Sequence, residues 1–238
     1  MRNSSDKTAP RQKIFRNAHY LVIFFSVLLC GCGITRSIEY SAHDQTSQQH
    51  NMPVRQVAVV VLVPDDRHLT ELGKIIDECS QLLFQQTGIR IFVKNYQTIS
   101  WKSSDRAGML QQVSDSMKAF SDPYDMAVAF APMSFPQLLS FAAFGGWEGV
   151  IDDVYRRYIV LRTIDSNVLL HELVHGFLFS NTHTHGLMSA TRICLVPGIA
   201  CFHRSMDLDR EDREEVMRKK WRNFSSEIHL RVVVDGIQ

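Results

Sequence analysis

The sequence carries almost no net charge, because its 26 Lys and Arg residues are balanced by 25 Asp and Glu residues. A protein that binds nucleic acid by neutralising phosphates needs a basic excess, so the composition argues against that class. Glycine, proline and cysteine are scarce, with 12, 7 and 5 residues, which excludes collagen-like, low-complexity and disulfide-dense proteins. Hydrophobic residues make up 45% of the 238 residues, and this composition predicts a globular protein with one core.

A long hydrophobic run is also missing, since the apolar segment Leu21–Leu29 is too short to span a bilayer. Before it, residues 1–18 contain five Lys or Arg residues and one Asp, and small residues follow it. This order is typical of a secretory signal peptide. The sequence Leu29-Cys30-Gly31-Cys32 resembles a bacterial lipobox, in which the last cysteine is lipidated after cleavage before it. An ordinary secretory cleavage and an uncleaved anchor remain alternatives.

The lipobox resemblance implies a signal peptide over residues 1–31; residues 32–55 are polar with little periodicity and are expected to be a tether, and the periodic pattern after them predicts a folded domain over 56–238. Removing the signal takes away a net charge of +4 and leaves the mature chain at −3. Gly33, and not Asp, follows Cys32, and in the lipoproteins that this sequence resembles this favours the outer membrane over retention in the inner one. We therefore expect a lipid anchor on Cys32 and a domain that faces the periplasm.

Disulfides persist in the periplasm, so a disulfide between other cysteines of the domain is possible there. Cys194 and Cys201 have six residues between them in a loop with Gly and Pro, so they are close enough to form a disulfide. Cys79 falls within an apolar helical stripe and is expected to be a buried, free thiol.

Hydrophobic periodicity predicts an α/β domain. The predicted strands are Val57–Val63, Ile89–Tyr96, Tyr124–Ala131 and Arg157–Thr163, and the predicted helices cover Leu69–Leu83, closed by Gly88, and Leu110–Phe120. Val57–Val63 is apolar throughout, which indicates a central strand with helices on both faces of its sheet. Phe135–Phe144 reads as a looser aromatic stretch. Residues 145–152 fit an edge strand that could accept an extended peptide, with a surface loop as the alternative.

The motif H-E-x-x-H occurs at His171, Glu172 and His175. Residues four apart stand one turn above each other on a helix, so both imidazoles can reach one metal ion. Apolar residues on the opposite side, from Leu169 to Leu178, predict an amphipathic helix that buries one face and presents the ligands on the other. Asp165 or Ser166 is the expected N-cap.

A catalytic zinc site needs a third protein ligand and an open fourth position. His183 and His185 follow the helix, and Leu187-Met188 comes after them. In this arrangement the chain resembles the metzincin clan of zinc peptidases, whose motif continues to a third histidine and a Met-turn beneath the metal. The resemblance implies a zincin-like fold with a mixed, twisted sheet, an edge strand, an active-site helix and a C-terminal helix at Leu208–Trp221. It also implies Zn²⁺ as cofactor and packing, not ligation, for Met188.

The spacing departs from the family pattern, because Leu178 and Asn181 stand where metzincins have glycine and the third histidine. Asn181 could still end the helix. We favour His183 as the third ligand, since a histidine followed by a small hydroxyl residue resembles the family, with His185 as the alternative. A carboxylate from the last helix would be a different arrangement, and its candidates are Glu211, Glu214 and Glu215. A solvated helix face capped by Asp209 is the preferred interpretation of those acids.

Three neutral histidines leave zinc its full charge, which lowers the pKa of the bound water so that Glu172 can take its proton and pass it to the leaving amine. The sequence therefore predicts a lipid-anchored zinc metalloendopeptidase that hydrolyses peptide bonds by Glu-assisted attack of zinc-bound water. The alternative is a non-catalytic zinc-binding lipoprotein of the envelope that acts as a binding module. Expected partners are a peptide or protein substrate and the membrane; nucleic acid is not expected, and the chain is expected to be a monomer.

Overall fold

The computed structural model describes residues 52–144, 146–179, 186–188 and 205–228. Its strands are β1 (Arg55–Val63), β2 (Ile89–Thr98), β3 (Met126–Phe130), β4 (Gly149–Ile151) and β5 (Tyr158–Leu161). Its helices are α2 (Leu69–Thr87), α3 (Arg106–Lys118), α4 (Phe135–Phe144), α5 (Ser166–His175) and α6 (Arg210–Lys219), with short 3-10 turns η3 (Asp66–His68) and η4 (Gly186–Met188). None of these helices is long and apolar enough to cross a membrane. The predicted signal peptide, the lipidation site Cys32 and most of the tether lie outside the described residues.

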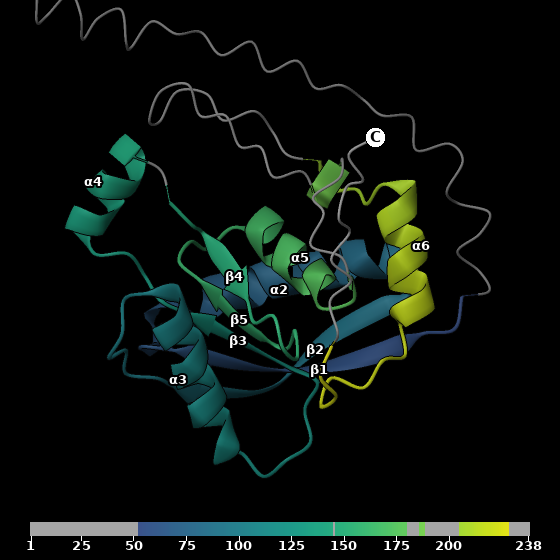
Figure 1. Cartoon of the computed structure of the whole chain (residues 1–238), viewed down its shortest axis with the longest axis horizontal. Coiled ribbons are helices and arrows are strands. Elements are labelled where there is room, and N and C mark those ends of the chain that lie inside the picture. Colours follow the sequence, from purple (N-terminus) through teal and green to yellow (C-terminus); the bar gives the residue numbers. More distant parts are fainter. Residues whose placement is uncertain (1–51, 145, 180–185, 189–204, 229–238) are drawn as a thin grey trace, which may run out of the picture. The chain divides into compact units, whose positions relative to one another are not determined.

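One five-stranded mixed sheet organises the protein, with strand order β2-β1-β3-β5-β4 (Figure 1). Strands β1, β2, β3 and β5 are parallel, and β4 runs antiparallel to β5, with Gly149 opposite Leu161 and Ile151 opposite Ile159. The α/β class is therefore confirmed. Residues 149–151 form an edge strand, so the edge-strand prediction is confirmed and the surface-loop alternative is wrong for them.

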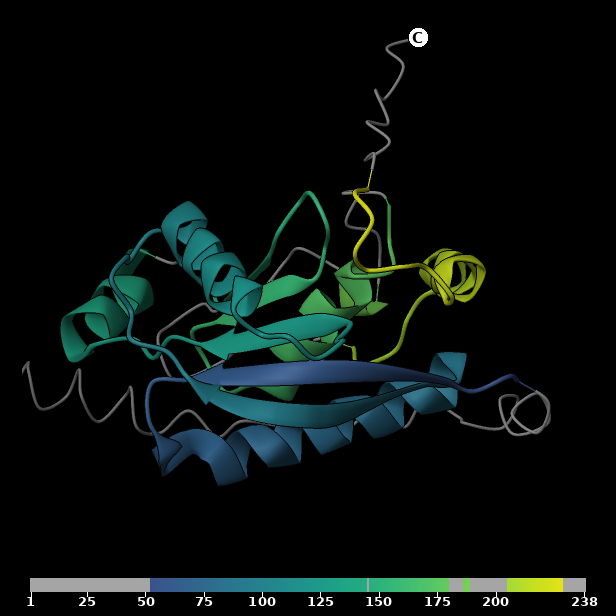
Figure 2. The ribbon, with the colours of Figure 1, turned by 90° about the horizontal axis from the view of Figure 1, so that it is seen from below.

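Helices cover both faces of the sheet, and Figure 2 shows α2 and α3 on opposite sides of it. The side chains of β1 alternate between two cores, because Val57, Val59 and Val61 pack with α2 and α5 while Val60 and Leu62 pack with α3. A strand that is buried on both faces needs an apolar residue at every position. The continuous apolar run of β1 is thus explained by its place in the middle of the sheet.

The end of α2 follows from one glycine. Gly88 has a φ of +69°, and its N–H donates to the Phe84 carbonyl at 2.8 Å. Such a left-handed C-terminal residue is accessible to glycine without a steric penalty. The prediction that Gly88 closes this helix is confirmed.

The segment Phe135–Phe144 corrects the sequence analysis, which treated it as a loose stretch, because it forms helix α4. Its start carries a capping-box signature: the Gln137 side chain accepts the Ser134 N–H at 2.9 Å, and the Leu138 N–H bonds back to the Ser134 carbonyl at 2.9 Å. Pro136 is tolerated because the first helical turn needs no intrahelical donor. The spacing Ser-x-x-Gln was the missed signal.

Candidate metal centre

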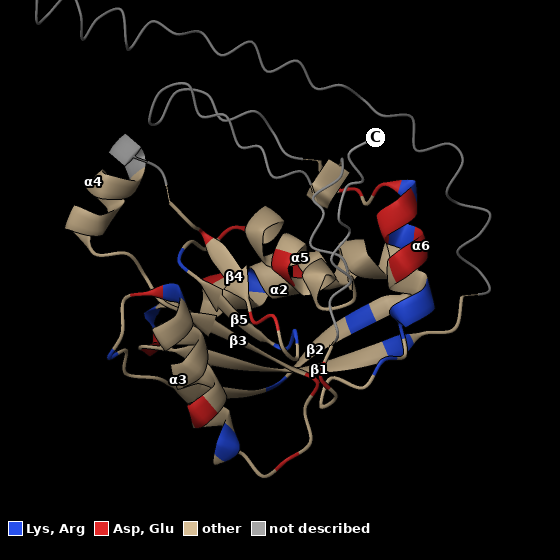
Figure 3. Ribbon diagram, viewed as in Figure 1, with Lys and Arg blue, Asp and Glu red and all other residues tan. Residues whose placement is uncertain are grey.

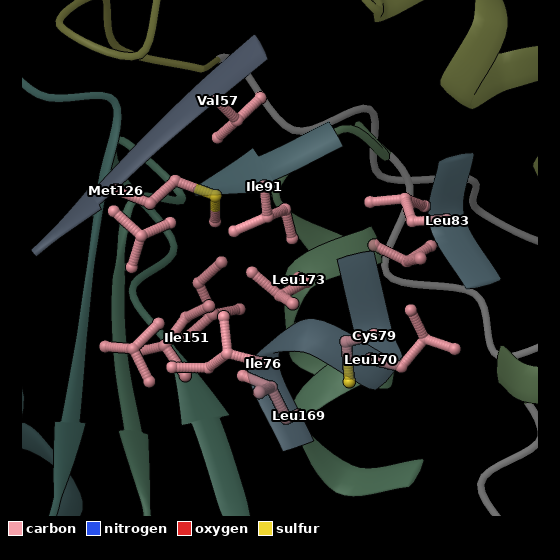
Figure 4. Close-up of a cluster of buried hydrophobic side chains, with 14 of the residues drawn as sticks. Val57, Ile76, Cys79, Leu83, Ile91, Met126, Ile151, Leu169, Leu170 and Leu173 are labelled. Carbon is pink, nitrogen blue, oxygen red and sulfur yellow. The ribbon is translucent and has the colours of Figure 1, made fainter. Parts of the chain in front are cut away.

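The candidate site lies on α5, and an N-cap residue in the sequence determines where this helix begins. The Asp165 side chain accepts the backbone N–H groups of Asn167 at 2.8 Å and Val168 at 3.2 Å. Asp165 is therefore the N-cap, and Ser166 is the first helical residue. The Cys79 thiol of α2 donates to the Ser166 carbonyl at 3.2 Å. Leu169, Leu170 and Leu173 of α5 pack with α2 and the sheet in the main core (Figure 4), so the helix is fixed from one side.

His171 and His175 lie together as the motif predicts. Their Nε2 atoms are 3.1 Å apart, and the two rings meet edge to face with centroids 4.7 Å apart. Nδ1 of His171 lies 3.0 Å from the Leu187 carbonyl oxygen. Because a carbonyl only accepts, this contact places the proton of His171 on Nδ1 and leaves a lone pair on Nε2.

The distance between the two nitrogens fits a shared metal ion. Two imidazole nitrogens bound tetrahedrally to zinc at 2.0–2.1 Å lie about 3.3–3.4 Å apart. The observed 3.1 Å is close to that value before any adjustment of the side chains. The contact from His171 to Leu187 is also of the kind that orients a metal-binding histidine, whose second ring nitrogen usually donates to a carbonyl or carboxylate. The pair therefore fits zinc.

Glu172 lies beneath the edge strand. A Cβ placed on Gly149 of β4 would be 2.8 Å from both Cγ and Oε1 of Glu172 and 2.7 Å from Cγ1 of Val168. The absence of a side chain at position 149 thus lets β4 approach the proposed general base. A glycine inside a strand is a known mark of such an approach, but the sequence analysis did not use it.

The ligand face of α5 is more buried than the amphipathic pattern predicts. His171, Glu172 and His175 are only 8%, 7% and 7% exposed. The covering comes from two places that the sequence analysis missed, β4 with Gly149 over Glu172 and η4 with the Leu187 carbonyl on His171. A helical pattern shows which residues are apolar, but it does not show that polar residues are covered by other segments.

The C-terminal end of α5 also differs from the prediction, which extended the apolar face to Leu178 and allowed an end at Asn181. The helix ends at His175, and the Gly176 N–H already bonds to the Leu173 carbonyl at 3.1 Å, a shorter-range contact than the α-helical one. Glycine is a poor residue for helix continuation. Two arginines bind the carbonyls beyond this point: Arg156 donates to those of His175 and Leu178, and Arg222 donates to that of Gly176.

Burial changes the acid–base properties of these neighbours. It lowers the pKa of the Arg156 guanidinium, although nearby carboxylates, Glu172 among them, act in the opposite direction. Burial lowers the pKa of Arg222 to about 10, so both arginines stay charged at neutral pH. For the Cys79 thiol, burial raises the pKa. Cys79 is fully buried and free, as predicted.

The predicted Met-turn residues lie close to the site. Leu187 and Met188 are fully buried in the main core, and Met188 packs there as expected of a structural methionine. Gly186 has a φ of +62°, and the Leu187 N–H donates to the Asp207 carbonyl at 2.9 Å. This bond fixes the backbone whose carbonyl holds His171.

The remaining candidates either lie on α6 or fall outside the described residues. His183, His185, Asn181, Cys194 and Cys201 lie outside the described residues. On α6, Glu211 is exposed, Glu214 pairs with Arg210 at 2.9 Å and Glu215 accepts the Phe179 N–H at 2.7 Å.

Helix α6 thus has the mixed, charged surface that Figure 3 shows, and Asp209 caps it through the Asp212 N–H at 2.8 Å. In the described part of the chain no three His, Cys, Asp or Glu side chains form a metal-binding group. In that part of the chain, the candidate metal ligands that lie together are two, His171 and His175.

Comparisons with known proteins give limited information. No protein-family model and no curated protein matches the sequence. The crystal structure of archaemetzincin from Methanopyrus kandleri is similar over 70% of this chain and 97% of that chain, with 16% identity and a TM-score of 0.47. A chaperone–substrate complex is similar over 59% of this chain and 28% of that chain, with 10% identity and a TM-score of 0.43. At these values neither similarity establishes a family or an activity.

Proposed function

We propose that this protein is a zinc-dependent metalloendopeptidase in which His171 and His175 hold the metal and Glu172 is the general base. The third ligand in this proposal is His183, with His185 as the alternative. The observation that supports it most is the 3.1 Å between the two Nε2 atoms, combined with the carbonyl that holds Nδ1 of His171. The carbonyl leaves the lone pair of His171 on Nε2, and the short distance places Nε2 of His175 where it could bind the same zinc ion.

The chain's own residues supply the other parts of a hydrolytic site. A bound zinc ion would polarise the scissile carbonyl and lower the pKa of a water molecule. In this proposal the carboxylate of Glu172, the residue next to His171 on α5, would accept a proton from the attacking water and donate it to the leaving amine. Glu172 is 7% exposed, and a site withdrawn from water strengthens such electrostatic interactions.

The substrate in this proposal is an extended peptide. Within the described residues, β4 pairs with β5 on one side and has no strand on its other side. An open strand edge can bind a peptide through main-chain hydrogen bonds. Since Gly149 of this strand lies against Glu172, a peptide on β4 would have its backbone near the general base.

The experiment that tests the proposal compares two Glu-to-Gln variants. Purified protein is expected to contain one zinc ion and to cleave fluorescently labelled casein, to lose this activity with a chelator and to regain it with zinc. Glu172→Gln should keep the zinc and abolish cleavage, because the amide cannot accept the proton. Glu211→Gln on the exposed face of α6 is the matched control and should leave zinc content and cleavage unchanged.

The outcomes distinguish the alternatives. Full activity in Glu172→Gln would contradict the mechanism, and activity lost in Glu211→Gln would favour the carboxylate of α6 as a participant. Zinc bound by a protein that cleaves no substrate would support the second function, a zinc-binding lipoprotein that serves as a binding module. Absence of zinc would contradict both.

We further propose export and lipidation at Cys32, with outer-membrane attachment facing the periplasm. The support is the lipobox-like sequence and Gly33 after it. Cys32→Ser should abolish incorporation of a labelled fatty acid and release the protein from the membrane fraction. Cys30→Ser is the matched control, because position 30 is removed with the signal peptide, and it should remain lipidated. Equal lipidation of both variants would contradict the assignment.

A further inference from the structure

Arg156 is one of the most deeply buried charged residues in the described part of the chain, with 1% exposure. Its Nη1 donates to the carbonyl oxygen of His175 at 3.3 Å and also to that of Leu178. These carbonyls belong to the proposed second metal ligand and to the segment that leaves α5 toward His183 and His185. We infer that Arg156 is a positioning residue for the metal site, an inference that rests on the proposed zinc-binding function.

The backbone of Arg156 is held in place by a neighbouring carboxylate. Asp152 accepts four consecutive N–H groups, from Tyr155 at 2.7 Å, Arg156 at 3.1 Å, Arg157 at 2.8 Å and Tyr158 at 2.7 Å. Arg156 has a φ of +48°, a left-handed conformation that is unfavourable for a side chain of this kind. A residue keeps such a conformation only where the surrounding contacts enforce it. Here the enforced turn directs the guanidinium at the end of α5.

The end of α5 needs these donors. The last carbonyls of a helix have no partner within the helix, and a cation near them is also favoured by the helix dipole. Arg222 acts in parallel, since it donates to the Gly176 carbonyl and, at 2.5 Å, to the Tyr155 carbonyl. Arg222 thereby links the Arg156 turn to the same helix end. Of these two arginines, Arg156 is the one that contacts the carbonyl of a proposed ligand, and it therefore positions His175 and the residues that follow α5.

The contact at Leu178 extends this positioning beyond the helix. The Leu178 carbonyl lies three residues after the proposed ligand His175, so Arg156 holds both the ligand and the start of the segment that follows it. Both bonds come from one nitrogen, Nη1, whose two N–H groups have fixed directions in the plane of the guanidinium. A lysine keeps the charge but is a single point donor on a flexible chain. Arg156→Lys is therefore the variant that removes the geometry and retains the charge.

Arg157 provides a matched control beside Arg156. It is also buried, with 8% exposure, and its guanidinium donates to the Tyr124 carbonyl at 2.9 Å and to Ser225 Oγ at 3.3 Å. Neither partner belongs to α5. Arg157→Lys should thus disturb the core to a similar degree without moving the proposed ligands.

The test measures zinc affinity by competition with a chelator, on the full chain in detergent, for the wild type and both lysine variants. Loss of an outer partner of a metal ligand typically weakens metal binding about 10–100-fold. We expect a loss of zinc affinity in that range for Arg156→Lys. For Arg157→Lys we expect a loss of less than about threefold, because Arg157 does not contact a proposed ligand. The visible bands of the cobalt-substituted protein should change in Arg156→Lys only, because they report ligand geometry. The melting temperature of the zinc-free protein should fall in both variants.

Wild-type zinc affinity in a folded Arg156→Lys variant would overturn the inference and leave the proposed function intact. An equal loss of affinity in both lysine variants would also overturn it, because the effect would then follow general stability. If Arg156→Lys does not fold, Arg156→Gln retains one neutral donor and takes its place. If both Arg156 variants fail to fold while Arg157→Lys folds, Arg156 is required for folding itself, and the positioning role is overturned. A wild type without zinc would overturn the inference and the proposed function together.

Discussion

Gly149 in the edge strand lies so close to Glu172 on α5 that position 149 has no room for a side chain. A Cβ there would be 2.8 Å from Cγ and from Oε1 of Glu172, closer than real Cβ atoms approach other heavy atoms. The distance between β4 and the proposed general base is therefore set by the absence of one methyl group. Any side chain at this position must displace the strand, the helix or the Glu172 carboxylate.

Gly149→Ala is expected to lower both stability and activity. Adding a methyl group to a closely packed position typically costs about 1–3 kcal/mol of unfolding free energy. The displaced Glu172 carboxylate should reduce kcat, while zinc content should be unchanged because the histidines are not contacted. Chemical denaturation, zinc analysis and casein cleavage measure the three effects.

Gly73→Ala is the control for this substitution. Gly73 lies within α2, and the nearest atom to an added Cβ is Tyr96 Oη at 3.8 Å, an ordinary contact. Alanine in place of glycine in a helix should raise the unfolding free energy by about 0.5–1 kcal/mol. Equal stability and activity of Gly149→Ala and the wild type would contradict the proposed crowding.

The parts of the fold that could be predicted from the sequence are those set by local patterns. The apolar run Val57–Val63 indicated a central strand, and all of its residues except the half-buried Ala58 lie in one of the two cores. Gly88 predicted the end of α2, and the spacing of His171 and His175 predicted that their Nε2 atoms lie together. Each of these features depends on residues that are close in sequence. Helix α4 was also predictable in principle, since Ser134 and Gln137 have the spacing of a capping box and the Gln137 side chain accepts the Ser134 N–H.

The parts that could not be predicted depend on contacts between distant segments. The Leu187 carbonyl on His171 is a backbone atom 16 residues away, so no side-chain pattern indicates it. The arginines that bind carbonyls at the end of α5, Arg156 and Arg222, come from a turn before the helix and from the C-terminal region. Periodicity therefore predicted the helix but could not predict what covers its polar face or what binds the carbonyls at its end.

Asp165→Ala should destabilise the protein through the start of α5. The Asp165 carboxylate accepts the N–H groups of Asn167 and Val168, and loss of an N-cap costs about 0.5–2 kcal/mol. Thermal or denaturant unfolding measures the loss. Asp165→Asn should recover most of it, because asparagine is an equally good N-cap; a variant as unstable as Asp165→Ala would show that charge, not capping, is the main contribution.

Cys79 should resist alkylation in the native protein. Its thiol is fully buried, and burial raises its pKa, so the reactive thiolate is disfavoured. An exposed cysteine would react faster as the pH rises toward 9, through its usual pKa of about 8.5. Labelling of the Cys79 peptide, followed by mass spectrometry, should instead stay slow from pH 7 to about 9 and become rapid in guanidinium. Fast labelling of the native protein would contradict the burial.

The proposed disulfide between Cys194 and Cys201 predicts a different labelling pattern. Denaturation alone should leave both peptides unlabelled, because the sulfur atoms are bonded to each other, and labelling should begin only after a reductant is added. Cys79 in the same sample reacts without reductant and serves as the internal control. Labelling of either peptide in guanidinium without reductant would contradict the disulfide.

His183→Ala and His185→Ala decide the third ligand. Loss of a direct ligand should weaken zinc binding at least as much as loss of an outer partner, which costs about 10–100-fold. We expect this loss for His183→Ala, because a histidine followed by a small hydroxyl residue resembles the metzincin pattern, and near-wild-type affinity for His185→Ala. The reverse result would assign the ligand to His185 and keep the hydrolase proposal. Unchanged affinity in both single variants and in the double variant would leave His171 and His175 without a third histidine from this segment, and the proposed three-histidine site would be wrong.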